Sequence, residues 1–276
     1  MAKGSQKLRL VRRNSPEPTF TFSPAQQSVI DHRGAQLVVY GGPGTGKTTT
    51  LIESVVARVK DGVDPNSILI LTYGRERASE LRDAIALRAG TTSFDPLART
   101  FHSLSFSILN EKLAPDNARY VLVSGAEQDL AIREMLENPH VTIPWHSELR
   151  EALSTRGFAR EVRDLILRAT ELGLDAKTLQ ARGLALDENY WDGVAHFWAS
   201  YFGANELKSA TVGERLVRID PSSIINEAIH LLQEDEARLS HFRNRFTTVV
   251  VDEFQESDKS QRRLLQLLAP QDLSKR

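Results

Sequence analysis

The ten residues GGPGTGKTTT at positions 41–50 constrain the fold more than any other part of the sequence. They fit the pattern G-x-x-x-x-G-K-[ST], in which glycines let the backbone curl so that several N–H groups face one anion. The apolar run QLVVY (36–40) precedes the loop, and a helical pattern (48–62) follows it. A strand, a glycine loop and a helix in this order predict a phosphate-binding loop, because the helix N-terminus adds its positive end.

The residue types in this loop predict the chemistry of its ligand. Lys47 is placed to reach the β- and γ-phosphates of a nucleotide, and the Thr48 hydroxyl is placed to hold Mg²⁺. A glycine-rich turn with an incidental lysine is the alternative, but the agreement of strand, loop and helix patterns argues against it. The loop residues expected to bind nucleotide are Gly41, Gly42, Pro43, Gly44, Thr45, Gly46, Lys47, Thr48 and Thr49.

Hydrophobic patterns divide the chain into two kinds of sequence. Short apolar runs that predict buried strands alternate with helical patterns near both ends: strands at 36–40, 67–73, 96–101 and 247–251, helices at 24–30, 48–62 and 75–90. Long amphipathic segments fill the middle of the chain instead. We therefore predict an α/β fold, a parallel core with a helical insertion domain. The expected division is a flexible basic tail at 1–21, a core at 22–105 and 246–276, and the insertion at 106–245.

Composition limits the class of protein. The 276 residues have a formal net charge of −1 and no cysteine, which excludes disulfides and thiolate metal sites and suits a reducing cytoplasm. No apolar run approaches the roughly 18 to 20 residues that span a bilayer, so we expect a cytoplasmic protein without a membrane contact. The first twenty residues carry five basic residues and one acidic residue. A solvated tail and an auxiliary contact to nucleic-acid phosphates both fit that charge.

The sequence TTVVVDEFQ (247–255) supplies the carboxylates that a metal-dependent phosphate site needs. An apolar strand delivers Asp252 at its carboxyl end, where ligands gather in open α/β sheets. Asp252 is placed to hold Mg²⁺ through water, and Glu253 to orient and deprotonate an attacking water. An acidic helix start after a strand is the alternative for this short pattern.

Adjacent carboxylates with a water to activate favour hydrolysis over transfer to another substrate. We locate no acceptor-binding or lid elements of a small-molecule kinase, and the guanine-recognising N-K-x-D of a GTPase does not occur. The site is therefore interpreted as that of an ATPase, with ATP and Mg²⁺ as its cofactors.

Several motifs in a fixed order resemble the amino-terminal part of superfamily 1 DNA helicases of the UvrD/Rep type. FSPAQQSVI (22–30) is similar to the adenine-binding Q motif, usually L-N-x-x-Q, with Gln26 at the glutamine position and Ser23 in place of asparagine. GGPGTGKT is similar to the first ATP motif, and VVVDEFQES (249–257) to the second. The resemblance implies a RecA-like P-loop core and ATP-dependent helicase activity. The catalytic residues it implies are Lys47, Asp252, Glu253 and Gln255.

Two further segments resemble the family's motifs Ia and Ib. TYGRERASELR (72–82) is similar to T-F-T-N-K-A-A-x-E-M-R, with departures at the T-N-K positions, and ARTFHS (98–103) contains T-F-H-S. By this resemblance Tyr73 faces single-stranded DNA and offers a surface for base stacking. The DNA-binding residues implied are Thr72, Tyr73, Thr100 and His102, and the implied partner is single-stranded or partly duplex DNA.

Two features of the predicted insertion have more than one interpretation. YWDGVAHFWASYF (190–202) carries six aromatic residues. Trp191, Val194, Trp198 and Phe202 share one helical face, which favours core packing over a base-stacking surface. The arginine-rich segment STRGFAREVRDLILR (154–168) fits a DNA-backbone contact and a solvated helix face equally well.

The resemblance also implies a missing half of the ATP site. In this family ATP lies between two RecA-like cores, and arginine fingers are worth about 10³ to 10⁵ in rate in related NTPases. The family's next motif, G-D-x-x-Q-S-I-Y, does not occur in the 276 residues, so the predicted core is incomplete. A second core is expected from a longer chain or a partner. We expect the isolated chain to bind ATP–Mg²⁺, to hydrolyse it feebly and not to unwind DNA.

Three functions stay compatible with the sequence. The first is a DNA helicase or translocase acting on single-stranded DNA in repair or recombination. The second is a truncated, non-catalytic nucleotide- or DNA-binding module that serves a partner, and the third is a segment of a helicase–nuclease. Lys47, Asp252 and Glu253 together favour the first, because a pure binding module does not need the base.

Overall fold

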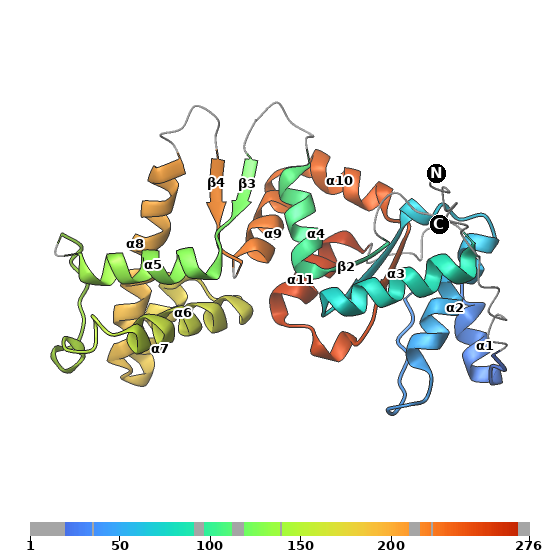
Figure 1. Cartoon of the computed structure of the whole chain (residues 1–276), viewed down its shortest axis with the longest axis horizontal. Helices are drawn as coiled ribbons and strands as arrows, with labels where there is room; N and C mark the ends of the chain where they lie inside the picture. The colour runs from blue at the N-terminus through green and yellow to red at the C-terminus, as the bar shows by residue number, and fades with distance from the viewer. Residues whose placement is uncertain are drawn as a thin grey trace, which may run out of the picture.

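The computed structural model describes residues 20–34, 36–90, 97–111, 119–138, 140–209, 216–221 and 223–269. Within these ranges the chain forms two lobes (Figure 1), a sheet lobe built on parallel strands and a helical lobe built from α5 to α8. Residues 1–19 of the predicted basic tail lie outside the described residues. Among the helices that are described, none is long and apolar enough to cross a bilayer.

The elements follow one another in the order that Figure 1 labels. The helices are α1 (Pro24–Ile30), α2 (Lys47–Lys60), α3 (Arg75–Ala89), α4 (Phe101–Asn110), α5 (Gly125–Glu137), α6 (Arg156–Glu171), α7 (Ala176–Leu186), α8 (Asn189–Ser209), α9 (Ile224–Glu234), α10 (Glu236–Arg245) and α11 (Lys259–Leu268). The strands are β1 (Ile68–Thr72), β2 (Ala98–Thr100), β3 (Arg119–Leu122), β4 (Leu216–Ile219) and β5 (Thr248–Val251). Short 3₁₀ turns lie at Pro65–Ser67, Ser147–Leu149 and Phe254–Glu256.

Local sequence explains where several helices begin. Ser23 and Ser124 start α1 and α5 with reciprocal capping boxes, and Asp258 does the same for α11. In each box the cap side chain accepts from a backbone N–H that the helix leaves free, which is worth about 1 kcal/mol. Pro24 at the first position of α1 fits the predicted helix start.

The main sheet has three parallel strands in the order β2-β1-β5. Ile70 in the central strand pairs with Ala98 of β2 and with Val250 of β5. All five residues of β1 are buried, because side chains cover both faces of the sheet. The strands predicted at 67–73, 96–101 and 247–251 are thereby confirmed.

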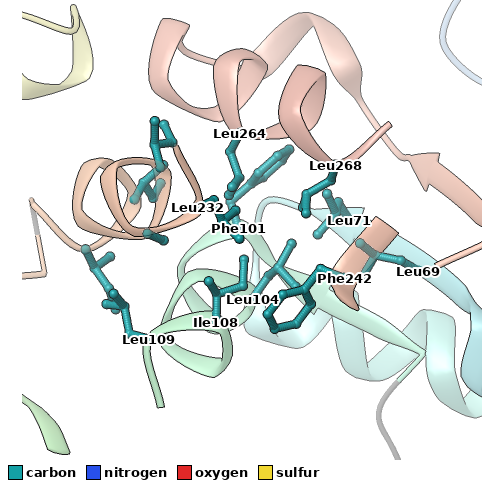
Figure 2. Close-up of a cluster of buried hydrophobic side chains, with 14 of the residues drawn as sticks. Leu69, Leu71, Phe101, Leu104, Ile108, Leu109, Leu232, Phe242, Leu264 and Leu268 are labelled. Carbon is teal, nitrogen blue, oxygen red and sulfur yellow. The ribbon is translucent and has the colours of Figure 1, made fainter. Parts of the chain in front are cut away.

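The alternation of β1 sends its side chains into two separate cores. Leu69 and Leu71 pack with α4, α9, α10 and α11, and Figure 2 shows them beside Phe101, Leu104 and Leu232. On the opposite face, Ile68 and Ile70 pack with residues of α2 and α3. The sheet is therefore the middle layer of a helix–sheet–helix lobe.

The strand predicted at 36–40 is wrong. These residues are not paired in a sheet, and Val38 and Tyr40 are 62% and 91% exposed. In the described sheet β5 pairs with β1 and has no described strand on its other side. An apolar run becomes a buried strand only when a neighbour satisfies its backbone N–H and C=O groups. No described strand does so here, and the run stays at the surface.

The helical lobe has its own core, built from α5, α6, α7 and α8. Val194 and Phe197 of α8 are fully buried, and Trp198 and Tyr201 are 6% and 5% exposed. The core-packing interpretation of the aromatic stretch is confirmed for these residues. The side chain of Phe202 lies outside the described part of the structure.

The range 106–245, predicted as the insertion, does not pack as one unit. The helices α9 and α10, and the end of α4, share a core with β1 and α11 of the sheet lobe. Two short strands that were not predicted, β3 and β4, pair in parallel between the lobes, with Arg119 opposite Leu216. Apolar periodicity showed these helices but not the surface on which each one packs.

Candidate nucleotide-binding site

The glycine loop turns on two left-handed residues, Gly44 (φ 75°) and Gly46 (φ 80°). Side chains other than glycine rarely adopt this conformation. The Thr45 hydroxyl closes the loop by donating to the Gly42 carbonyl at 2.9 Å. A Cβ at Gly41 would lie 2.7 Å from Thr45 Oγ1. The loop therefore needs glycines at these positions for its curl, as a phosphate-binding loop requires.

Lys47 begins α2, and its ammonium group lies over the loop. Lys47 Nζ donates to the carbonyls of Gly41 and Gly42 at 3.0 and 3.1 Å. The first N–H groups of α2 have no partner within the helix, so they favour an anion at this point. The helix start and the lysine are thus brought together where the loop predicted a phosphate. Pro43 lies in the turn itself, and Thr48 and Thr49 lie in the first turn of α2.

Gln26 joins the first helix to the loop. Its Oε1 accepts from the Ser23 backbone N–H at 2.9 Å, and its Nε2 donates to the Thr45 carbonyl at 3.1 Å. Both ends of the amide are therefore engaged with the chain itself. The predicted adenine-binding glutamine is placed directly beside the phosphate loop.

The carboxylates lie at the carboxyl end of β5, as the sequence predicted. Asp252 is 5% exposed, and its backbone N–H donates to the Leu71 carbonyl at 2.9 Å. Glu253 has a φ of 53°, in the left-handed region that non-glycine residues avoid. Gln255 Nε2 donates to Glu253 Oε2 at 2.6 Å. Strained backbone at such a position is typical of functional sites.

Arg77 of α3 connects the two halves of the site, and the sequence analysis did not single it out. Its Nη2 donates to Thr48 Oγ1 at 2.7 Å, and its Nε donates to Asp252 Oδ2 at 3.1 Å. Its Nη1 also forms an ion pair with Glu80 at 3.1 Å. Burial lowers the pKa of Arg77, but hydrogen bonds to Glu80 and Asp252 outweigh that effect and raise it. Its sequence position, next to motif residues at the end of β1, was the available signal.

The oxygens that converge on Arg77 suit a magnesium ion. A hydroxyl and a carboxylate are hard oxygen donors of the kind that Mg²⁺ prefers. The described residues hold no cluster of three or more His, Cys, Asp or Glu side chains that would form a dedicated metal cage. Mg²⁺ usually completes its shell with water and substrate phosphates, so Thr48 and Asp252 fit its needs.

The four predicted DNA-binding residues lie at the carboxyl ends of β1 and β2, but their surroundings differ. Thr72 is 1% exposed. Tyr73 is half-buried, with its ring 5.7 Å from that of Phe101, and burial raises the pKa of its hydroxyl. Thr100 caps α4 by accepting from the Ser103 N–H at 3.1 Å. His102 has an exposed side chain. Of the four, only His102 offers a largely free side chain to a ligand.

The charge state of His102 follows from its neighbours. Desolvation by the atoms around it lowers the pKa of His102, while Asp258 raises it and Arg75 lowers it. Because the pKa lies below the ordinary value of about 6.5, the ring is mostly neutral at pH 7. His102 therefore offers a hydrogen bond rather than a positive charge.

Comparison with known proteins agrees with this geometry. The family model of the UvrD/REP helicase N-terminal domain matches residues 22–273. Over 245 residues the chain is 26% identical to the ATP-dependent DNA helicase UvrD1 of Mycobacterium leprae, covering 87% of this chain and 29% of that protein. It is 33% identical over 116 residues to DNA helicase IV of Escherichia coli K12, covering 42% of this chain and 16% of that protein.

A shorter match extends to a different kind of helicase. The chain is 36% identical over 78 residues to one of the proteins of the ATP-dependent helicase/nuclease of Ligilactobacillus salivarius, covering 28% of this chain and 6% of that protein. The chain spans less than a third of the length of these relatives. Because the family match runs from the start of α1 to beyond the end of α11, the chain belongs to the UvrD/REP helicase family, through its N-terminal domain.

Proposed function

We propose that the chain is the ATP-binding and hydrolysing part of an ATP-dependent helicase or translocase that acts on single-stranded DNA in repair or recombination. One observation carries the proposal. Thr48 of the loop and Asp252 of β5, 204 positions apart by number (252 − 48), converge on the guanidinium of Arg77 at 2.7 and 3.1 Å. They are the hydroxyl and the carboxylate that P-loop ATPases use to hold Mg²⁺.

Each residue has a distinct role in the proposed hydrolysis. Lys47 turns from the loop carbonyls to the β- and γ-phosphates, and Thr48 and Asp252 hold the magnesium ion. Bound Mg²⁺ neutralises the charge that develops on the phosphates. Glu253, oriented by Gln255, takes a proton from water as the water oxygen bonds to the γ-phosphorus. The bond from that phosphorus to the β–γ bridging oxygen breaks, and ADP leaves.

The DNA-binding surface is proposed at the carboxyl ends of β1 and β2. The exposed, neutral ring of His102 supports a hydrogen bond to a base or phosphate there. Tyr73 and Thr100 line the same edge, and Thr72 contributes through its backbone because its side chain is buried. We expect His102→Ala to weaken binding of a single-stranded oligonucleotide, measured by fluorescence anisotropy. Unchanged affinity would remove His102 from the surface.

The rest of the architecture is proposed on the same basis. The sheet lobe is a RecA-like core that includes α4, α9 and α10, and the helical lobe is the domain inserted in it. A second RecA-like core, from a longer chain or a partner, supplies the arginines that complete the site. The 276 residues assayed alone should therefore hydrolyse ATP feebly and unwind no DNA. Robust unwinding by this chain would refute that part of the proposal. The expected setting is the cytoplasm.

Glu253→Gln tests the catalytic assignment. The substitution keeps the shape of the side chain but removes the base, so we expect ATP–Mg²⁺ to bind as before. DNA-stimulated ATP turnover should fall by about 10² to 10⁴. Glu256→Gln, three residues along and exposed, is the matched control. Equal turnover in wild type and Glu253→Gln would instead favour a binding module without catalysis.

A further inference from the structure

Arg77 lies where the proposed site would hold its metal. Its guanidinium donates to the Thr48 hydroxyl and to the Asp252 carboxylate, the two protein groups that the ATP–Mg²⁺ site needs. The motif pattern T-F-T-N-K-A-A-x-E-M-R, which residues 72–82 resemble, has alanine at the position of Arg77. The contact is therefore a property of this chain rather than of the motif.

A guanidinium at this position competes with a divalent cation. Its N–H groups fill acceptor positions on the oxygens that Mg²⁺ approaches to about 2.0–2.1 Å, and two cations this close repel each other. We propose that Arg77 holds the metal ligands as a tethered cation when no nucleotide is bound, and that Mg²⁺ arriving with ATP must displace it. The inference rests on the proposed function and adds a control of its metal requirement.

The burial of the two partners explains why the contact forms and how it can open. Asp252 is 5% exposed, and a buried carboxylate is stable only when it is paired or hydrogen-bonded. The side chain of Arg77 is 39% exposed. The guanidinium therefore faces solvent on one side and can leave Asp252 without disturbing the core.

Glu80 gives the displaced guanidinium a second partner. It lies one helical turn along α3, is 67% exposed and already accepts from Arg77 Nη1 at 3.1 Å. Rotation of Arg77 toward Glu80 frees Thr48 and Asp252 while one ion pair is kept. Arg77 thus has two positions, and the metal–nucleotide complex shifts it from the first to the second.

A magnesium titration tests the competition. Binding of a fluorescent ATP analogue is measured at rising Mg²⁺ concentration for wild type and variants. In Arg77→Ala we expect the half-saturating Mg²⁺ concentration to fall about tenfold, the value of one charged hydrogen bond. Arg77→Lys should lie between the two, because an ammonium is a point charge that does not bridge both oxygens. Arg75→Ala, exposed on the same turn of α3, is the matched control and should equal wild type.

Two further measurements separate competition from a general loss of structure. Glu80→Gln removes the second partner and should raise the half-saturating Mg²⁺ concentration. Thermal unfolding without nucleotide should show a lower Tm for Arg77→Ala in EDTA, because Asp252 loses its partner. Mg²⁺ alone should then raise the Tm of Arg77→Ala more than that of wild type.

The outcomes are distinct. If wild type and Arg77→Ala need the same Mg²⁺ concentration, or Arg77→Ala needs more, the competition is refuted while the nucleotide site stands. If Arg77→Ala instead binds the analogue more weakly in EDTA, with an unaltered response to Mg²⁺, Arg77 is a phosphate ligand and the competition is likewise refuted. If neither wild type nor Arg75→Ala binds nucleotide with Mg²⁺, the proposed function itself fails.

Discussion

The two lobes differ in what their buried side chains do. In the helical lobe the core consists of apolar and aromatic residues from α5 to α8, and Arg163 pairs with Asp129 and Asp164 at the surface. In the sheet lobe the strands end in Thr72 and Asp252, polar residues that are 1% and 5% exposed. Every predicted catalytic and nucleotide-binding residue belongs to the sheet lobe.

This difference indicates a division between packing and chemistry. Parallel strands present their carboxyl ends at one edge, so residues far apart in the sequence meet there. Helices that pack through one apolar stripe provide no such edge, and their polar residues face solvent. The helical lobe is therefore expected to tolerate changes that leave the nucleotide site intact. The next four predictions test that independence.

The largest effect is expected from a cavity in either core. Phe197→Ala in the helical lobe and Phe101→Ala in the sheet lobe should each cost about 3 to 5 kcal/mol, since both rings are buried. The three tryptophans, Trp145, Trp191 and Trp198, all lie in the helical lobe. Tryptophan fluorescence during urea unfolding therefore reports on that lobe.

Independence of the lobes makes a clear prediction for this pair. Phe197→Ala should shift the fluorescence transition and leave ATP affinity unchanged below the transition. Phe101→Ala should abolish nucleotide binding at lower urea while the fluorescence transition stays in place. If both variants shift the same single transition, the lobes unfold together and the comparison fails.

The next effect is a pH dependence at the junction between the lobes. Asp220, at the end of β4, is 3% exposed and accepts from the Tyr201 hydroxyl at 3.3 Å. Burial raises its pKa to about 6, although hydrogen bonds from Tyr201 and Gln128 oppose the shift. The folded state therefore binds the proton more tightly than the unfolded state. Its stabilising contribution is complete below pH 4 and is lost as the pH rises through 6.

Asp220→Asn should remove this loss. Asparagine keeps the acceptor oxygen but does not ionise, so the variant should be more stable than wild type at pH 8, by up to about 3 kcal/mol. The difference in unfolding free energy between the two proteins should shrink between pH 6 and pH 4. A difference that stays constant over this range would mean that Asp220 does not titrate as described.

Lys47→Ala should affect binding without affecting stability. Lys47 Nζ hydrogen-bonds only to exposed loop carbonyls in the described structure, so the Tm without nucleotide should not change. Affinity for ATP–Mg²⁺ should fall about 10- to 100-fold, the value of hydrogen bonds to a charged group. Lys60→Ala, at the other end of α2, is the control in isothermal titration calorimetry. Unchanged affinity in Lys47→Ala would contradict the loop assignment.

The smallest effect is expected at Gln26. Gln26→Ala removes the hydrogen bonds to Ser23 and Thr45, each worth about 1 kcal/mol. We expect about fivefold weaker ATP binding and little change in the helical lobe. Gln27→Ala, whose amide bonds to Asp31 away from the loop, should bind ATP like wild type. Equal affinities in the two variants would argue that the link from α1 to the loop has no role in binding.

Much of the site could be predicted because it is local. Gly44 and Gly46 mark a left-handed loop wherever it lies, and an apolar strand followed by Asp252 predicts a carboxylate at the end of a sheet. The starts of α1, α5 and α11 are likewise written in adjacent residues. These features depend on backbone conformations and hydrogen bonds that span only a few positions.

Only the tertiary structure decided the features that need a distant partner. The apolar run at 36–40 predicted a buried strand, but no described strand pairs with it. The amphipathic pattern of α9 predicted a helix without showing that it packs on the sheet lobe. The contact from Arg77 to Asp252 joins residues 175 positions apart. Sequence by itself determined which residues carry the chemistry, and tertiary packing decided which of them meet, because burial and ion pairing depend on neighbours that the local chain does not contain.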